Sequence, residues 1–402
     1  MSKSGIKIYP YRWVILAIYF IISAVIQMQW LTFASVSGAA QEFYQTTALR
    51  IDFLSIIYMI VFIVMSIPAS YIIDTWGLRK GLIIGALLTG IFGTLKAWGG
   101  NSLLLVTVSQ IGLAVAQPFI LNAVTKVGAK WFPVEERATA AGLGTLAQYV
   151  GIIIALAVTP MLIQVTQSGG YDFVKMLWFY GIASIVSAIL IIIFMREEPP
   201  TPPMSDEFTQ RTSPIAGIKE IFGNRDMILL LILFFIGLGI FNAVSTCIDQ
   251  ICQNLTMDET GIVGGVMLIG GVLGAVILPA ISDKKRKRKP LLVTCMVLML
   301  PGLIGLTVFN EFIPMMISAF IFGFFMMGVG PVGFQYGAER SYPAPESTSQ
   351  GIILMMGQIS GIMFVFGVNK IGVFITMIGF IILTIINIII STRLKESMNK
   401  FL

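Results

Sequence analysis

Amide and indole side chains interrupt the long apolar runs of this chain at a few positions. Gln148 and Gln358 each stand inside such a run, and Trp30 lies near the end of another that also holds Gln27 and Gln29. An amide surrounded by hydrocarbon must either bond a neighbouring helix or line a hydrated cavity. An indole there either belongs to the interfacial aromatic belt or holds a cation on its face, for about 2 kcal/mol in a desolvated site. These residue types favour noncovalent binding of a small solute.

The composition excludes soluble proteins and argues against enzymes. The 402 residues are 56% hydrophobic and only 11% charged, whereas ordinary globular chains are roughly 25% charged. Because no His is present, we expect no metal, haem or other cofactor and no enzymatic activity. Cys247, Cys252 and Cys295 lie in or beside apolar stretches, which is typical of free, packed thiols. The chain is predicted to be an integral membrane protein.

Twelve apolar runs are long enough to cross a bilayer, which takes about 20 helical residues. The sequence therefore predicts an all-α integral membrane fold with 12 transmembrane helices in two sets of six. Because Lys3, Lys7 and Arg12 lead directly into a run too long for a signal peptide, we expect no cleaved leader. The predicted spans are 13–36, 51–73, 81–98, 102–125, 138–163, 173–195, 227–252, 260–282, 291–309, 312–337, 347–368 and 371–391.

The basic residues predict the orientation of the chain. All but four of the 26 Lys and Arg residues fall on the amino-terminal side of the predicted spans, the exceptions being Arg50, Lys96, Lys175 and Lys370. Since basic loops stay in the cytoplasm, we predict a multi-pass protein of the cell membrane with both termini cytoplasmic. The run KKRKRK (284–289) resembles a nucleic-acid patch, but between two spans we interpret it as a topology determinant beside anionic lipid headgroups. We expect the lipid bilayer, and no nucleic acid, as partner.

The two halves of the chain repeat each other at a nearly constant offset. SYIIDTWGLRKGL, which contains Asp74, corresponds to PAISDKKRKRKPL, which contains Asp283. WFPVEERATAAG likewise corresponds to SYPAPESTSQGI, and Gln148 then aligns with Gln358. Six spans per half make these parallel repeats related by an axis along the membrane normal. We expect two pseudo-symmetric six-helix bundles over 1–195 and 227–402, joined by a polar, Pro-rich cytoplasmic linker over 196–226.

DTWGLRK (74–80) resembles the loop signature between the second and third spans of the major facilitator superfamily. In that superfamily two bundles rock about a substrate site at the bilayer midplane, and the loop latches them in the outward-facing state. The resemblance implies gating roles for Asp74, Gly77 and Arg79. Further gating candidates, from the repeat and from the cytoplasmic helix ends, are Asp283, Glu136 and Arg137.

More closely, the chain is similar to the feline leukaemia virus subgroup C receptor family of transporters. YRWVILAIYFIISAVIQMQWLTFASV, AVAQPFILNAVTKVGAKWFPVEERATAAG and YPAPESTSQGIILMMGQISG carry the similarity across both halves. It implies a carrier of small organic cations such as choline or ethanolamine, with haem an older proposal, that holds the ammonium group between aromatic rings and glutamines. The chain departs from the pattern at Asn242, where a Tyr is expected. The implied substrate-binding residues are Trp30, Gln148, Gln358, Asn242 and Phe241, with Gln29 beside Trp30 as a further candidate.

Several functions remain open from the sequence. Transport by facilitated diffusion is favoured, because no Arg or Lys lies in mid-span to bind an anion and no buried carboxylate is obvious for proton coupling. The alternative is a proton-coupled exporter of drugs or metabolites with an apolar, Met- and Phe-rich cavity. A non-transporting membrane receptor is disfavoured, since the linker and tails offer no signalling domain. We expect a small-molecule substrate and a monomer.

Overall fold

The computed structural model describes the whole chain except residues 1–7, 134–135, 167–169, 202–213, 286 and 397–402. Among the described residues, twelve helical segments are long and apolar enough to cross a bilayer, which confirms the predicted all-α fold with 12 spans. A small hairpin between the fifth and sixth spans was not predicted, with Gln164 paired antiparallel to Asp172.

The helices and strands follow the order of the predicted spans. The first half contains α1 (Tyr11–Trp30), the 3-10 turn η1 (Ala34–Val36), α2 (Ser37–Tyr44), α3 (Ala48–Thr75), α4 (Leu78–Trp98), α5 (Leu103–Leu121), α6 (Val124–Trp131), α7 (Arg137–Ile153), the π-helical turn η3 (Ile154–Val158), α8 (Thr159–Leu162), β1 (Gln164–Val165), β2 (Tyr171–Asp172) and α9 (Val174–Phe194). The second half contains α10 (Pro214–Gly223), α11 (Arg225–Thr246), α12 (Ile248–Ile251), α13 (Met257–Lys285), α14 (Lys289–Val308), α15 (Phe312–Ser341), α16 (Glu346–Ile371) and α17 (Val373–Thr392).

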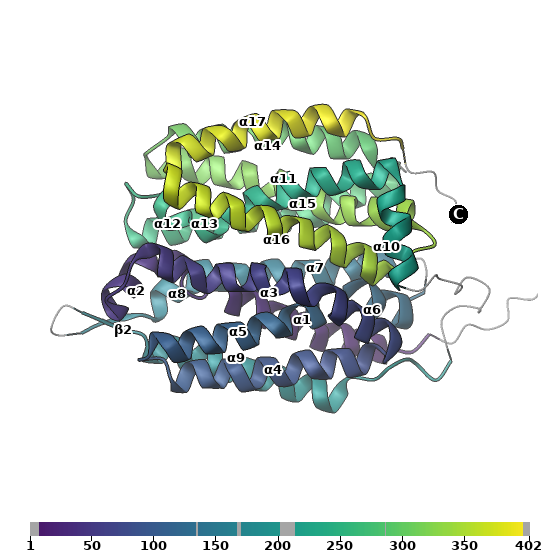
Figure 1. Ribbon diagram of the computed structural model, residues 1–402, viewed down its shortest axis with the longest axis horizontal. Helices are drawn as coiled ribbons and strands as arrows, with labels where there is room; N and C mark the ends of the chain where they lie inside the picture. The colour runs from purple at the N-terminus through teal and green to yellow at the C-terminus, as the bar shows by residue number, and fades with distance from the viewer. Residues whose placement is uncertain (1–7, 134–135, 167–169, 202–213, 286, 397–402) are drawn as a thin grey trace, which may run out of the picture.

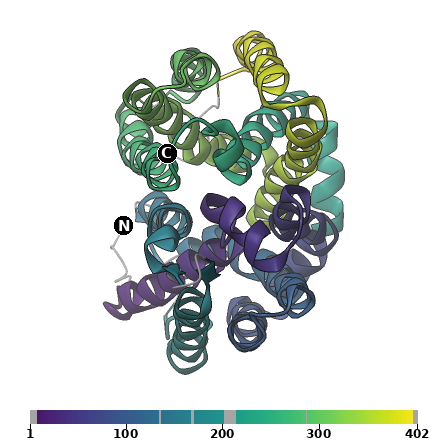
Figure 2. The same ribbon diagram turned by 90° about the vertical axis from the view of Figure 1, so that its left-hand side faces the viewer.

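The two halves form two groups of helices that lie side by side (Figure 1), and Figure 2 shows the same arrangement from one end. Helices α3 and α16 pack together along the boundary, and α7 packs against α13. One end of the molecule carries α6, α10 and the end of α17, and the opposite end carries α2, α12 and the β hairpin (Figure 1). We call these the inner end and the outer end. The predicted linker region 196–226 contains α10, and α11 begins within it at Arg225.

The first span is not one continuous helix, although the sequence predicts one over 13–36. Helix α1 ends at Trp30, and Leu31 leaves the helical conformation with φ −102° and ψ 27°. The Thr32 hydroxyl donates to the Gln29 carbonyl oxygen at 2.8 Å, and the Ser35 hydroxyl donates to Ala155 at 3.3 Å. Hydroxyl groups that bond backbone carbonyls compete with the helical ladder, which explains why the chain turns here.

Small residues allow the helices to approach closely. A Cβ on Gly151 of α7 would overlap the Ala24 carbonyl of α1, and a Cβ on Gly274 of α13 would overlap the Phe324 carbonyl of α15. Such contacts hold helices together in lipid, where apolar surface supplies little driving force. The apolar part of the first span is 78% buried, against 22% for the last. Helix α1 is therefore central and α17 is peripheral.

Candidate substrate site and gates

Trp30 lies at the end of α1 and is locked to α3. Its indole N–H donates to the Ser55 carbonyl oxygen at 3.2 Å, and the Ser55 hydroxyl donates back to the Trp30 carbonyl oxygen at 3.2 Å. The side chain is buried, with 4% of the residue exposed. A tryptophan of the interfacial belt contacts lipid and water, so this burial argues against that alternative.

Asn242 and Phe241 lie in the last turns of α11, and both are buried. The Asn242 amide donates to the Gly357 carbonyl oxygen of α16 at 3.1 Å. A Cβ on Gly361 would lie 3.0 Å from both the Asn242 Cβ and the Met59 sulfur of α3. Asn242 is therefore placed where α11 and α16 meet a helix of the first bundle, while Phe241 is part of the apolar core.

The symmetric glutamines lie at similar depths in their helices. Gln148 is about 17 Å from the start of α7, and Gln358 is about 18 Å from the start of α16. Gln148 is buried and Gln358 half-buried, and neither amide makes a hydrogen bond to another described residue. In the described part of the chain, no contact thus supports the alternative that these two amides bond neighbouring helices.

Gln29 faces α9 instead of the second bundle. Its amide nitrogen donates to the Tyr180 carbonyl oxygen at 3.1 Å and to the Ser184 hydroxyl at 2.8 Å. The residue is 0% exposed. Both of its amide hydrogens are thus used by α9, and its role as a substrate-binding candidate stays a prediction.

Gln27 and Gln117 form a buried pair that the sequence analysis did not assign to the site. The Gln117 amide nitrogen of α5 donates to the Gln27 oxygen of α1 at 2.8 Å. The Gln117 oxygen is buried without a partner among the described residues. A buried acceptor without a donor costs about 1–3 kcal/mol, so a ligand or water that donates to it is favoured. Gln117 could have been identified from the sequence as an amide inside the predicted span 102–125.

A carboxylate closes the outer end of the seam between the bundles. Asp52, near the start of α3, accepts hydrogen bonds from Gln250 of α12 at 2.8 Å and from Asn369 of α16 at 3.1 Å. Both donors belong to the second bundle, and Asp52 is only 3% exposed. This corrects the expectation that no carboxylate is buried. The sequence places Asp52 at a helix end, but only packing decides that the second bundle covers it.

Asp249 of α12 makes a reciprocal contact across the same seam. Its carboxylate accepts the backbone N–H of Gly38 in α2. Burial raises the pKa of Asp249 above its usual value, although the Gly38 N–H acts in the opposite direction. Each bundle therefore contributes one acidic residue to the outer seam, and each acid bonds the other bundle.

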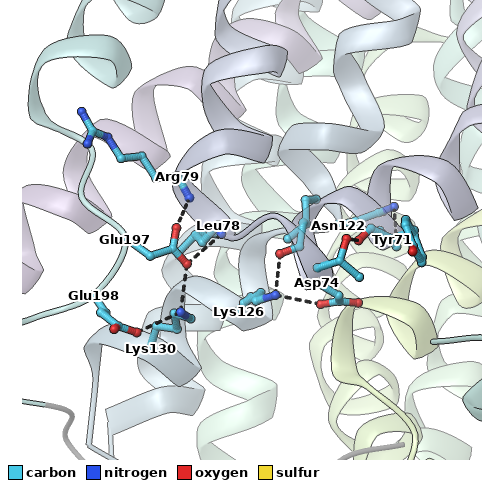
Figure 3. A network of polar contacts seen from close by, with 12 residues as sticks. Tyr71, Asp74, Leu78, Arg79, Asn122, Lys126, Lys130, Glu197 and Glu198 are labelled. Carbon is cyan, nitrogen blue, oxygen red and sulfur yellow. Dashed lines mark hydrogen bonds and ion pairs between the residues drawn. The ribbon is translucent and has the colours of Figure 1, made fainter. Parts of the chain in front are cut away.

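At the inner end, the predicted latch residue Asp74 bonds α6, and the start of α4 bonds Glu197 in the segment that follows α9 (Figure 3). The Asp74 carboxylate accepts from Lys126 of α6 at 3.0 Å, and Lys126 also donates to the Ile73 carbonyl oxygen. Gly77 has a φ of +105°, and a Cβ there would lie 2.7 Å from Glu197. Gly77 is therefore required both for its backbone angle and for the room that it leaves.

Glu197, which follows α9, clamps the start of α4. Its carboxylate accepts the backbone N–H groups of Leu78 at 3.0 Å and Arg79 at 2.7 Å, together with the Lys130 ammonium at 2.9 Å (Figure 3). Burial raises the pKa of Glu197, but these hydrogen bonds outweigh it and leave the pKa below its usual value. The role of Arg79 in this structure is thus carried by its backbone N–H.

The second half repeats this clamp. Glu396, which follows α17, accepts the backbone N–H groups of Arg288 at 2.6 Å and Lys289 at 3.2 Å at the start of α14. An anion at a helix N-terminus satisfies unpaired N–H groups and the helix dipole. The two glutamates could not be aligned from the sequence alone, because each follows the last helix of its half in a polar tail.

The other gating candidates are only partly described. Glu136 pairs with Arg12 at the start of α1, at 3.0 Å, again within the first bundle. Arg137 begins α7 and Asp283 lies in α13, but their side chains are outside the described part of the chain.

The inner ends of the bundles meet through small polar side chains. The Ser66 hydroxyl of α3 donates to the Gly351 carbonyl oxygen of α16 at 3.4 Å, and Asn122 donates to Ser66 and Ser70. Ile218 of α10 covers the same seam, over a cavity of about 30 Å³ that Ser66, Ser70 and Gly351 also line. The bundles are therefore in contact at both ends.

Lys96 is one of the four basic residues that the sequence places on the side opposite the amino terminus. It lies near the outer end of α4 but is 0% exposed. Its ammonium donates to the Thr32 hydroxyl at 2.8 Å and to the Gln110 oxygen at 3.4 Å. A buried cation is thus present, inside the first bundle.

Comparisons with known proteins agree with this architecture. The family model described as Major Facilitator Superfamily matches residues 15–365. The chain is 29% identical over 374 residues to an uncharacterized MFS-type transporter of Caenorhabditis elegans, covering 89% of this chain and 64% of that protein. It is 29% identical over 387 residues to the choline/ethanolamine transporter flvcr2a of Danio rerio, covering 90% and 81%.

Among solved structures, a bacterial homologue of the human lysosomal transporter Spinster, in an inward-facing and unoccupied conformation, superposes with a TM-score of 0.68 at 13% identity. The match covers 96% of this chain and 98% of that structure, which establishes the fold. The spans, the repeated clamp and the family match lead to one conclusion. The chain belongs to the Major Facilitator Superfamily, whose members are transporters and not enzymes.

Proposed function

We propose that this transporter carries a small, choline-like organic cation across the membrane. The observation that carries the proposal is the set of buried, uncharged polar and aromatic groups formed by Trp30, Asn242 and the Gln27–Gln117 pair. A quaternary ammonium is attracted to an indole face and to amide oxygens, and needs no carboxylate. The similarity to proteins named choline/ethanolamine transporters supports the same substrate class.

Movement by alternating access is supported by the two seams. The outer seam depends on the bonds of Asp52 and Asp249, and the inner seam on Ser66 and Gly351. Opening one seam while the other stays closed would expose the site to one side at a time. No covalent step is required.

A second candidate function, in which transport is coupled to protons, has specific support from the structure. Facilitated diffusion was favoured because no buried carboxylate was expected, and Asp52 removes that reason. A proton-coupled exporter of drugs or metabolites is therefore the second candidate, with Asp52 as the group that would take the proton. Haem is a further alternative substrate, and a non-transporting receptor is the least favoured function.

We further propose that the protein is a monomer in the cell membrane with both termini in the cytoplasm. The excess of Lys and Arg on the amino-terminal side supports this orientation. Both ends of the described chain lie at the inner end, where the Tyr11 hydroxyl donates to the Phe194 carbonyl oxygen and the Tyr336 hydroxyl donates to that of Lys395. An epitope tag on either terminus should be reachable by antibody only after the cells are permeabilised.

Uptake of radiolabelled choline into proteoliposomes tests the substrate, with and without a pH gradient. We expect saturable uptake that Trp30→Ala reduces by about tenfold or more. Trp178→Ala is the matched control, since Trp178 is 41% exposed on the outside of α9. Gln117→Leu should weaken binding as well, because it removes the amide that faces Gln27.

The effect of the pH gradient distinguishes facilitated diffusion from proton-coupled export. Uptake that is unchanged when the gradient is removed supports facilitated diffusion, and strict dependence on the gradient supports the proton-coupled exporter. Equal uptake by Trp30→Ala and Trp178→Ala would exclude Trp30 from the site. If organic cations are not transported, the proposed substrate class is wrong.

A further inference from the structure

The fully buried Lys96 has no acidic partner in the part of the chain that the structure describes. Among the described residues, no carboxylate lies within ion-pair distance of its ammonium, which is surrounded by the Thr32 hydroxyl, the Gln110 oxygen and the Tyr180 ring at 5.3 Å from the ring centroid. A buried ammonium is costly unless nearby groups compensate for its lost hydration. The compensating group is the end of α1.

Helix α1 ends inside the protein, two residues before Thr32. The last carbonyl groups of a helix have no partner within it and carry the negative end of the helix dipole. Both hydrogen-bond partners of Lys96 also donate to this end. The Thr32 hydroxyl donates to the Gln29 carbonyl oxygen at 2.8 Å, and the Gln110 amide nitrogen donates to the same oxygen at 3.5 Å.

Lys96 orients the two groups, the Thr32 hydroxyl and the Gln110 amide, that donate hydrogen bonds to the Gln29 carbonyl oxygen. Because it donates to the Thr32 oxygen, the Thr32 hydrogen is left to point at Gln29. Because it donates to the Gln110 oxygen, as Tyr58 does at 3.4 Å, the Gln110 nitrogen is turned towards Gln29 and towards the Leu54 carbonyl oxygen at 3.3 Å.

We propose that Lys96 is a positioning residue, which caps the broken end of α1 and thereby fixes Trp30 in the substrate site. Trp30 directly follows the capped Gln29 carbonyl, and its own carbonyl and indole are fixed by Ser55 of α3. The backbone at the break is thus held from two sides. Lys96 acts on it through Thr32 and Gln110, and Ser55 bonds it directly. The effect on substrate rests on the proposed function, whereas the cap itself does not.

The test compares Lys96→Met with Asn387→Leu. Met keeps an unbranched side chain and removes the ammonium. Asn387 is also 0% exposed and donates one hydrogen bond, to the Leu233 carbonyl oxygen at 3.0 Å, but it lies in the second bundle. Asn387→Leu therefore reproduces the loss of a buried polar group without touching α1. The measurements are binding of radiolabelled choline, thermal unfolding, and hydrogen exchange of the segment 28–36.

We expect Lys96→Met to weaken choline binding by about tenfold or more, and Asn387→Leu to leave it within about twofold. The double variant Trp30→Ala/Lys96→Met should bind no more weakly than Trp30→Ala alone, because both changes act through one ring. The link to Trp30 would be overturned if the affinity losses of the two single variants multiply in the double variant. It would also be overturned if Lys96→Met loses no more affinity than Asn387→Leu.

Hydrogen exchange separates this inference from the proposed function. If Trp30→Ala alone leaves choline binding unchanged, the proposed site is wrong, and exchange still tests the cap. Faster exchange of residues 31–36 in Lys96→Met, with no change there in Asn387→Leu, supports the cap. Exchange rates equal to those of the unmodified protein would overturn it, even if the variant unfolds at a lower temperature.

Discussion

Removing the charge of Asp52 should open the outer end of the transporter. Gln250, at 2.8 Å, and Asn369, at 3.1 Å, donate to the same Asp52 oxygen. Asp52→Asn keeps the shape of the side chain and can place an amide oxygen there, so it turns two charge-assisted hydrogen bonds into two neutral ones. Hydrogen bonds to a charged group contribute about 1.5–3 kcal/mol each, against about 0.5–1.5 for neutral ones. We estimate a loss of about 2 kcal/mol across the seam, or a shift of about 30-fold towards the outward-open state.

Double electron–electron resonance measures this shift directly. Spin labels at Thr47 and Gln253, which are exposed at the outer ends of the first and second bundle, report the distance across the seam. Glu42→Gln is the matched control, because Glu42 is an exposed outer carboxylate of α2. Asp52→Asn should populate a longer distance that the control lacks. Identical distance distributions in both variants would refute the lock.

Two further predictions concern the inner clamp. Gly77→Ala should lower the free energy of unfolding by at least about 1 kcal/mol more than Gly372→Ala. Both glycines have a φ near +105°, but only Gly77 lies against Glu197. Thermal unfolding of the two variants measures the difference, and equal losses of stability would contradict the clamp. Glu197→Gln should destabilise the protein at neutral pH and progressively less in acid. The folded-state pKa of Glu197 lies below its ordinary value of 4.5, so its contribution is complete above that value and is lost as the pH falls through the lowered pKa. A difference in melting temperature that stays constant down to about pH 3 would show that the Glu197 charge contributes nothing.

Much of the fold could be predicted from the sequence because the bilayer restricts what a chain can do. An apolar run of about 20 residues in lipid must satisfy its backbone internally, so helices follow from composition and length. The repeat around Asp74 and Asp283 then predicted two related bundles. The break after Trp30 was not predicted, because the hydroxyl of Thr32 is compatible with a helix until a partner helix is known.

The candidate site could be predicted only in part. Trp30, Gln148 and Gln358 were identified from residue type, depth and family resemblance, and the structure places all three in buried or half-buried positions. Gln29 and Gln27 are two positions apart on α1, yet Gln29 bonds α9 and Gln27 bonds Gln117. Residues two apart on a helix face different directions, and which neighbour each meets depends on how the helices pack.

Hydropathy, repetition and the distribution of basic residues were enough to determine the number of spans, the twofold organisation and the family resemblance, since each depends on local composition or on comparison of one segment with another. The state of the charged residues was decided only by the tertiary structure. Asp52 and Lys96 both lie near helix ends, where a sequence predicts exposure, and both are covered by helices far away in the chain. Whether a charge is buried depends on the surfaces that pack over it, which no local pattern records.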